Sequence, residues 1–144
     1  MKKITSLLII LVFLCVSLTS CGFDEESVRA ELVGTWVEEG TPMNLDNGMS
    51  VISDDCYVLY SNGEFLNLSV MQYYKSGKTL GNPIVNEKEG TYKIYKDKIK
   101  FTNDSGWSYD KTYLWNEKSG KITQLGSGWV KVSNSTDYLD SLIK

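Results

Sequence analysis

The side chains able to do chemistry in this 144-residue chain are three cysteines and a few closely spaced carboxylates. Histidine is absent from the whole sequence. Ser-His and Cys-His nucleophilic systems are therefore excluded, and the usual zinc sites lose their nitrogen ligand. The sequence indicates no catalytic residue, no metal site and no cofactor, and we expect a protein that is not an enzyme.

Carboxylate pairs are the remaining route to acid–base chemistry, for example on sugars. The candidate pairs are Asp54-Asp55, Glu38-Glu39, and Asp104 with Asp110. Adjacent side chains of a strand point to opposite faces of a sheet, so neither doublet makes a natural pair. Asp46-Asn47-Gly48 and Asp54-Asp55 also offer oxygen ligands for Ca²⁺, but the EF-hand spacing is absent and turns are the favoured interpretation.

Cys21 lies at the end of a segment with the layout of a targeting signal. Lys2 and Lys3 form a short positive region, and residues 4–16 are almost entirely apolar. This apolar run is shorter than the roughly 20 residues that a membrane span needs, and its flanks are typical of a signal peptide. We therefore expect residues 1–20 to be removed from the mature protein.

The four residues that end this segment, Leu18-Thr19-Ser20-Cys21, resemble the lipobox of bacterial lipoproteins. The resemblance implies that the Cys21 thiol takes a diacylglycerol and that the chain is cut just before it. Several acyl chains on one cysteine, palmitate among them, give a stable membrane anchor where a single chain does not. The alternative is an ordinary secretory signal in which Cys21 has no role.

Residues 21–31 are acidic and are expected to form a lipidated tether with a short helical turn. The run Asp24-Glu25-Glu26 is similar to the surface-export signal of lipoproteins from Bacteroides and its relatives. That likeness implies a cell-envelope protein, lipid-anchored to the outer membrane and exposed on the surface. The alternative interpretation is a solvated tether without an export role.

The remaining residues, 32–144, are enough for one domain with a core and too few for two. Loss of Lys2 and Lys3 leaves 13 basic and 18 acidic side chains, a net charge of −5. This balance argues against a nucleic-acid partner, and we expect a monomer. Cys56 has no cysteine left to pair with, so we interpret it as a small strand residue and not as a reactive thiol.

Gly, Asn and Asp recur at short intervals from residue 34 onward, between runs rich in Val, Ile, Tyr, Trp and Thr. This pattern predicts an all-β protein, an antiparallel up-and-down barrel of about eight strands. Besides two hairpins, strands are expected at residues 34–38, 49–53, 107–115, 122–125 and 129–133. A short C-terminal helix is expected at residues 136–143, where Tyr138, Leu139 and Leu142 have helical spacing.

The first hairpin is predicted at Asn62-Gly63, treated as a two-residue turn. In that register Leu59 faces Leu66 and Tyr57 faces Leu68 on the core side, and Tyr60 and Phe65 lie outside. The second hairpin is predicted at Lys96-Asp97. There, Ile94 faces Ile99 and Tyr92 faces Phe101 on the core side, and Lys93 and Lys100 point to water.

Three segments carry a resemblance to a known group of proteins. They are Leu32-Val33-Gly34-Thr35-Trp36, Glu89-Gly90-Thr91-Tyr92 with Asp97-Lys98-Ile99-Lys100-Phe101, and Gly128-Trp129-Val130-Lys131-Val132. Their order resembles the lipocalin-like small lipoproteins of Bacteroides-type bacteria, over residues 32–133. Gly-Thr-Trp also opens avidin-like barrels. True lipocalins usually carry a late Arg over the opening Trp, where this chain offers Lys131.

The resemblance implies a barrel that binds a small apolar or amphipathic ligand, with Trp36 as the plug of one end. The residues expected at the plug and cavity are Trp36, Tyr57, Leu59, Leu66, Leu68, Tyr92, Ile94, Ile99 and Phe101. The alternative function is a non-enzymatic envelope protein that presents loops or an aromatic face to a partner protein or a glycan. The residues of that face are Trp107, Tyr109, Tyr113 and Trp115, for which a place in the core is the favoured interpretation.

Overall fold

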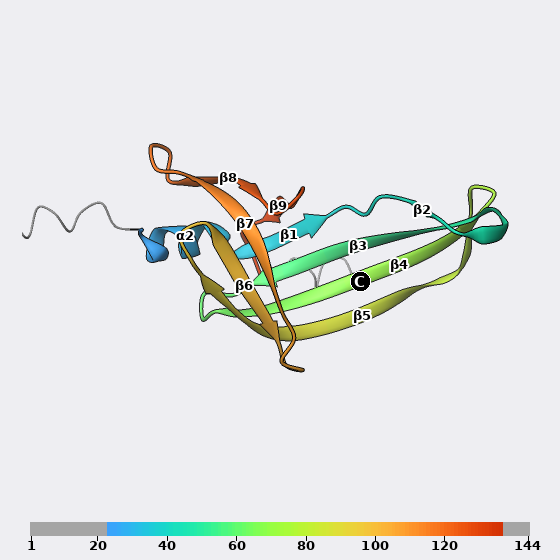
Figure 1. Cartoon of the computed structure of the whole chain (residues 1–144), viewed down its shortest axis with the longest axis horizontal. Coiled ribbons are helices and arrows are strands. Elements are labelled where there is room, and N and C mark those ends of the chain that lie inside the picture. Colours follow the sequence, from blue (N-terminus) through green and yellow to red (C-terminus); the bar gives the residue numbers. More distant parts are fainter. Residues whose placement is uncertain (1–22, 137–144) are drawn as a thin grey trace, which may run out of the picture.

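The computed structural model describes residues 23–136 (Figure 1). The elements in chain order are α2 (Glu25–Leu32), β1 (Gly34–Glu38), β2 (Met43–Asn44), the 3₁₀ helix η1 (Asp46–Gly48), β3 (Met49–Leu59), β4 (Glu64–Lys75), β5 (Lys78–Ile94), β6 (Lys98–Asn103), β7 (Ser108–Asn116), β8 (Lys121–Leu125) and β9 (Val130–Ser133). Within the described residues, α2 is the only α-helix and no helix has the length and apolar character to cross a membrane. The expected C-terminal helix lies outside the described residues, apart from Thr136.

The strands form one antiparallel sheet that curls into a nearly closed barrel. The strand order is β8-β7-β6-β5-β4-β3-β1-β9, with β2 paired to β3. The two ends of this order, β8 and β9, follow one another in the chain, so the seam of the barrel falls at the loop that joins them. The prediction of an antiparallel barrel of about eight strands is confirmed.

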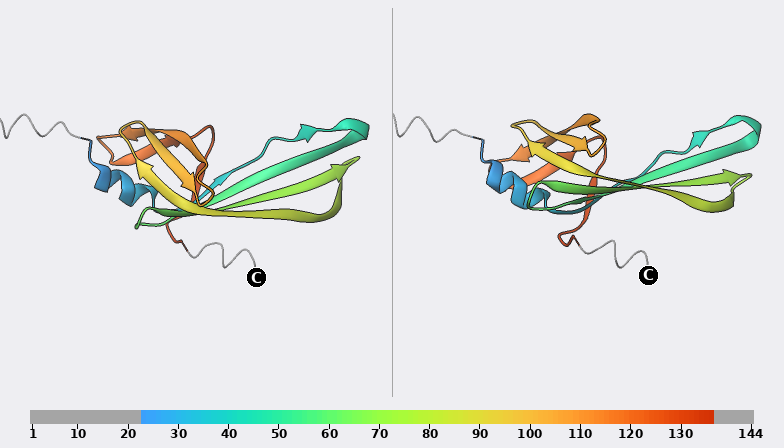
Figure 2. Two further views of the ribbon diagram at one scale, coloured as in Figure 1. Left: turned by 60° about the horizontal axis from the view of Figure 1, so that its bottom comes forward. Right: turned by 90° about the horizontal axis from the view of Figure 1, so that it is seen from below.

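Three strands extend well beyond the barrel, as both views of Figure 2 show. We call residues 49–54 of β3, 70–75 of β4 and 78–85 of β5 the wing. The outer neighbour of β5 on this side, β6, begins to pair with it only at Gly90. A Cβ atom at Gly90 would come within 2.2 Å of the Thr102 carbonyl oxygen, so the close approach of β5 to β6 requires glycine here.

Helix α2 closes the end of the barrel opposite the wing (Figure 2). Asp24 caps its N-terminus by accepting a hydrogen bond from the backbone N–H of Ser27, at 3.3 Å. Val28 and Leu32 lie on one side of the helix, four residues apart, and both are fully buried in the core. The stretch expected to be a tether at residues 21–31 is therefore part of the folded domain from Glu25 onward, because two apolar side chains on one helical face have core to bury against.

Strand β1 places Trp36 in the core, as the sequence predicts for a plug residue. Trp36 is buried, and its indole N–H donates to the Leu32 carbonyl at 2.8 Å. Lys131 of β9 places its Nζ atom 5.5 Å from the centroid of the Trp36 ring. Gly34 adopts φ +130°, and a Cβ there would meet the Ser133 carbonyl oxygen at 2.3 Å, so this tight entry into the barrel excludes any side chain.

The first hairpin differs from its predicted register by one residue. The backbone N–H of Tyr60 donates to the Glu64 carbonyl at 3.0 Å, so the loop contains three residues, with Gly63 at φ +88°. Leu59 pairs with Phe65, and Tyr57 pairs with Asn67. A slip of one residue exchanges the two faces of a strand, so every inward residue of β4 was assigned to the wrong side.

This shift corrects two predicted cavity residues. Leu66 and Leu68 lie on the outer face of the barrel, in a small cluster with Val58, and not in the interior. Phe65, expected outside, is only 2% exposed and belongs to the core. The second hairpin has the predicted register: Ile94 pairs with Ile99, and a two-residue loop joins β5 to β6.

Candidate functional site

Side chains fill the half of the barrel interior that lies next to α2. The predicted plug and cavity residues Trp36, Tyr57, Leu59, Tyr92, Ile94, Ile99 and Phe101 are all buried there. Phe65, Tyr113, Leu125 and Trp129 join them, together with Val28 and Leu32 of α2. Large aromatic side chains thus occupy this end of the barrel, as in small barrels filled by their own side chains.

The opposite end, toward the wing, is hollow. We call this hollow the mouth; its volume is about 450 Å³. It is lined by Glu38, Asp55, Tyr57, Phe65, Asn67, Ser69, Lys88, Asn103, Trp107, Tyr109, Asp110 and Lys111. These residues come from six strands or their ends, which puts aromatic rings and polar groups around one opening. The volume lies within the range of small-molecule sites in proteins.

Glu38, at the end of β1, binds three other side chains at the mouth. One carboxylate oxygen, Oε2, accepts from Lys111 Nζ at 2.9 Å and from the Trp129 indole N–H at 2.7 Å. The other, Oε1, accepts from the Ser127 hydroxyl at 2.8 Å. Lys111 belongs to β7, and Ser127 and Trp129 belong to the loop between β8 and β9. The carboxylate therefore links the two sides of the barrel seam.

These contacts also set the charge of Glu38. Burial alone would raise the pKa of this carboxyl, but the hydrogen bonds from Lys111, Ser127 and Trp129 outweigh burial and hold its pKa below the usual range. The ion pair with Lys111 is mostly shielded from solvent. Glu38 is consequently an anion at neutral pH, and its charge is matched by the amine beside it.

A polar pair from β3 and β4 lies on the other side of the mouth. Asn67 is 3% exposed, and its amide donates to Asp55 Oδ1 at 3.3 Å. The same amide reaches the Cys56 carbonyl at 3.5 Å. A buried amide fixed in this way holds the Asp55 carboxylate in place at the opening.

Aromatic rings run in contact from the rim of the mouth into the core. Trp107 lies at the rim with 60% of its surface exposed, 5.0 Å from Tyr109 between ring centroids. Tyr109 stacks on Phe101 at 5.2 Å, and Tyr57 stacks on Trp129 at 4.0 Å. The Tyr109 hydroxyl donates to the Tyr57 hydroxyl at 3.2 Å. Burial raises the pKa of both phenols, so both stay neutral at physiological pH.

The four aromatic residues proposed as an interaction face are divided by the structure. Tyr113 is buried in the core and donates its hydroxyl to the Tyr95 carbonyl at 2.6 Å. Tyr109 and Trp115 are partly buried and pack against the same core. Trp107 alone of the four is largely exposed.

Opposite charges balance around the mouth. Its lining contains three carboxylates, Glu38, Asp55 and Asp110, and two amines, Lys88 and Lys111. Asp110 forms an ion pair at 2.7 Å with Lys98 of β6, which does not line the mouth. This pair leaves two carboxylates, Glu38 and Asp55, and two amines, Lys88 and Lys111, in the lining. The site therefore has no net charge that would select an anion or a cation.

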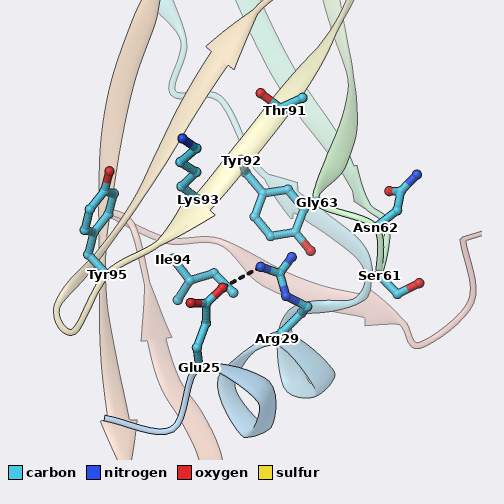
Figure 3. A pocket seen from close by; sticks show the side chains of 10 residues that line it. All are labelled: Glu25, Arg29, Ser61, Asn62, Gly63, Thr91, Tyr92, Lys93, Ile94 and Tyr95. Atoms are coloured by element: carbon cyan, nitrogen blue, oxygen red, sulfur yellow. Dashed lines mark hydrogen bonds and ion pairs between the residues drawn. The ribbon is translucent and has the colours of Figure 1, made fainter.

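A second hollow of about 540 Å³ lies outside the barrel, between α2 and the strand ends at Ser61–Gly63 and Thr91–Tyr95 (Figure 3). Arg29 in its lining already has partners. Its guanidinium binds Glu25 at 2.6 Å and lies 5.4 Å from the Tyr92 ring centroid. The Tyr92 hydroxyl donates to the Tyr60 carbonyl at 2.6 Å. This hollow has two aromatic rings in its lining, Tyr92 and Tyr95, where the mouth has four, so it is a weaker candidate than the mouth.

The remaining sequence-based predictions concern the cysteines and possible metal ligands. Cys21 lies outside the described residues. Cys56 is half-buried on the outer face of β3, next to Val58 and Leu68, and burial raises the pKa of its thiol. Over residues 23–136, no three His, Cys, Asp or Glu side chains gather in a way that would hold a metal ion.

Sequence reasoning considered Glu38 and Asp55 only as members of adjacent carboxylate pairs and set them aside, and it did not assign Asn67 or Lys111 to a site. Strand alternation contains the signal that would have found two of them. Asp55 is two residues from Tyr57, and Asn67 is two residues from Phe65, so each shares a face with a core aromatic. The wrong register of the first hairpin concealed this arrangement. No protein-family model matches the chain, and neither a curated protein nor a solved structure matches it.

Proposed function

We propose that this protein is a lipid-anchored lipoprotein of the cell envelope that binds a small amphipathic molecule at the mouth of its barrel. The observation that carries the proposal is the contrast between the two ends of the barrel. One end is closed by α2 and filled with side chains, and the other is a hollow of about 450 Å³ lined by aromatic rings and polar groups. Such a combination is characteristic of ligand sites in proteins.

The chemistry of the lining narrows the ligand from apolar to amphipathic. The floor of the mouth is formed by the rings of Tyr57, Phe65 and Tyr109, which suit an apolar surface. Its walls carry fixed hydrogen-bonding groups, among them the Glu38 and Asp55 carboxylates and the Lys111 amine. A purely apolar ligand would displace water from these groups without replacing its hydrogen bonds, at a cost in binding free energy.

The alternative function, presentation of an aromatic face to a partner, has less support. Tyr109, Tyr113 and Trp115 contribute to the core, which leaves a single exposed ring at Trp107. One exposed aromatic residue is ordinary for a protein surface. A site at the mouth explains why Trp107 lies beside Tyr109 and the polar cluster.

An NMR titration tests the proposal. Mature protein labelled with ¹⁵N is titrated with octanoate, with glycerol monooctanoate and with n-octyl-β-D-glucoside, each below its micelle concentration. At least one probe is expected to shift the amide signals of Asp55, Asn67 and Tyr109, with no shift at Arg29 or Thr91 of the second hollow. Tyr109→Leu should weaken that binding, and Leu114→Ala on the exposed side of β7 should not. Shifts confined to the second hollow, or none at all, would contradict the proposal.

A further inference from the structure

We propose that the ligand of the mouth is a neutral sugar ring within a glycan chain. This inference rests on the proposed function and names the chemical class of its ligand. A pyranose ring has a flat face of C–H groups and an equator of hydroxyl groups. The mouth offers a counterpart to each of these features, and it has room next to it for a neighbouring ring.

The aromatic rings at the rim supply the flat surface. Trp107 and Tyr109 lie in contact at 5.0 Å between centroids, and Trp107 is 60% exposed although it is one of the largest apolar side chains in the protein. The electron-rich face of an aromatic ring attracts polarised C–H groups as well as cations. An exposed indole at the edge of a polar hollow is therefore suited to stack on a sugar.

The polar groups around these rings match hydroxyl groups, which both donate and accept hydrogen bonds. Asp55 and Glu38 present acceptor oxygens, and Lys111 and Lys88 present donors. Glu38 and Asp55 are each held by other side chains, through Ser127 and Asn67 respectively. Partners that are already fixed lose little conformational entropy when a ligand binds.

The charge balance of the mouth favours a neutral sugar over charged amphipathic ligands. Asp110 is neutralised by its ion pair with Lys98, and the other two carboxylates of the lining, Glu38 and Asp55, are matched by its two amines, Lys111 and Lys88. A fatty acid, a phosphate ester or a uronic acid would gain no net attraction and would lose hydration on entry. A neutral ligand with many hydroxyl groups satisfies the site without adding charge.

The surroundings of the mouth favour a chain over a single ring. A third hollow, of about 570 Å³, lies along Glu87–Glu89 and Asn103–Ser105, and it shares Lys88 and Asn103 with the mouth. Polar side chains continue from the mouth onto the wing, because the hydroxyl of Ser69 at the mouth lies 3.2 Å from that of Ser53 in the wing. A ligand seated on Trp107 and Tyr109 can therefore extend over Lys88 without meeting a closed wall.

The test uses the mature chain on an array of neutral glucan, mannan, galactan and xylan oligosaccharides, with uronic-acid oligosaccharides as the charged comparison. Isothermal titration calorimetry with the best oligosaccharide then compares variants. Trp107→Ala is expected to weaken binding about tenfold, which corresponds to the loss of one aromatic contact. Tyr95→Ala removes an exposed aromatic of the second hollow of Figure 3 and should leave binding unchanged.

The outcomes distinguish this inference from the function on which it rests. Binding of a neutral oligosaccharide that is weakened by Trp107→Ala and not by Tyr95→Ala supports both. Octanoate or glycerol monooctanoate bound at the mouth, with no oligosaccharide bound, overturns the sugar and leaves the ligand site. Preference for uronic-acid oligosaccharides overturns the neutral ligand. No binding by any of these probes overturns both.

Discussion

At the scale of single residues, Glu38 has the most connections of any side chain at the mouth. It joins β1 to β7 through Lys111 and to the loop between β8 and β9 through Ser127 and Trp129. The seam of the barrel lies between β8 and β9, where the sheet order ends. One carboxylate therefore substitutes at this end of the barrel for hydrogen bonds of a closed sheet, and it also lines the proposed ligand site.

Glu38→Gln should reveal this role through the dependence of stability on pH. The folded-state pKa of Glu38 lies below its usual value of 4.5, so its contribution to stability is present above that pH and is lost as pH falls through the folded-state pKa. Chemical denaturation at pH 7 should show the variant less stable by about 1–3 kcal/mol, as for a charged hydrogen bond. Below the folded-state pKa, the two proteins should converge.

The neighbouring residue supplies the control. Glu39→Gln, at an exposed position, should change the unfolding free energy by less than about 0.5 kcal/mol at either pH. Equal effects of the two substitutions would show that Glu38 contributes only general surface charge.

At the scale of elements, the wing buries few of its side chains. Every residue of β5 from Lys78 to Glu89 is exposed, including the apolar Leu80, Ile84 and Val85. β6 pairs with β5 only from Gly90 onward, so the wing presents an edge strand. Pro83 lacks a backbone donor, and charged side chains follow it at Glu87–Glu89; both features discourage pairing with a foreign strand.

Amide hydrogen exchange should divide β5 in two. The amides of residues 79–86 are expected to exchange about 100-fold or more faster than those of Tyr92 and Ile94, because few apolar contacts oppose local opening in the wing. Mass spectrometry of peptides from the two regions measures the difference. Similar protection in both would mean that the wing is covered in solution, by a second copy or by another partner.

Helix α2 connects the element scale to the whole molecule. It closes the barrel base and begins at Glu25, with Asp24 as its cap. Only three peptide units separate Asp24 from Cys21, a reach of about 11 Å at most. A lipid on Cys21 would therefore hold the base of the barrel close to the membrane. The mouth and the wing would then point away from it, toward ligands in the surrounding space.

The proposed lipid anchor is tested with the whole protein. Cys21→Ser should abolish labelling by a radioactive or clickable palmitate and leave residues 1–20 uncut, seen as a larger mass on intact-protein mass spectrometry, because the thiol that would form the thioether is missing. Cys56→Ser is the matched control and should keep both the label and the cleavage. Acyl labelling that persists in Cys21→Ser would refute the anchor.

Much of the fold could be predicted from the sequence. Runs rich in Val, Ile, Tyr and Trp between turn residues correctly indicated antiparallel strands, and β1 was predicted with its observed bounds, Gly34–Glu38. The second hairpin was also correct, because its short turn leaves one register that places Ile94 with Ile99 inside and both lysines in water. These features depend on residues close together in the chain, where local patterns are informative.

The candidate site could not be predicted, because it depends on register and on distant contacts. Asn62-Gly63 indicates a hairpin but does not decide between a two-residue and a three-residue loop, and the difference moves Phe65 and Asn67 inside and Leu66 outside. Glu38 meets Trp129 across 91 positions of sequence. The sequence alone determined the antiparallel strands and their turns; only the tertiary structure decided which faces they bury and which polar groups meet at the mouth. The physical reason is that strand alternation defines two faces but does not say which of them is inside until strands far apart in the chain pack together.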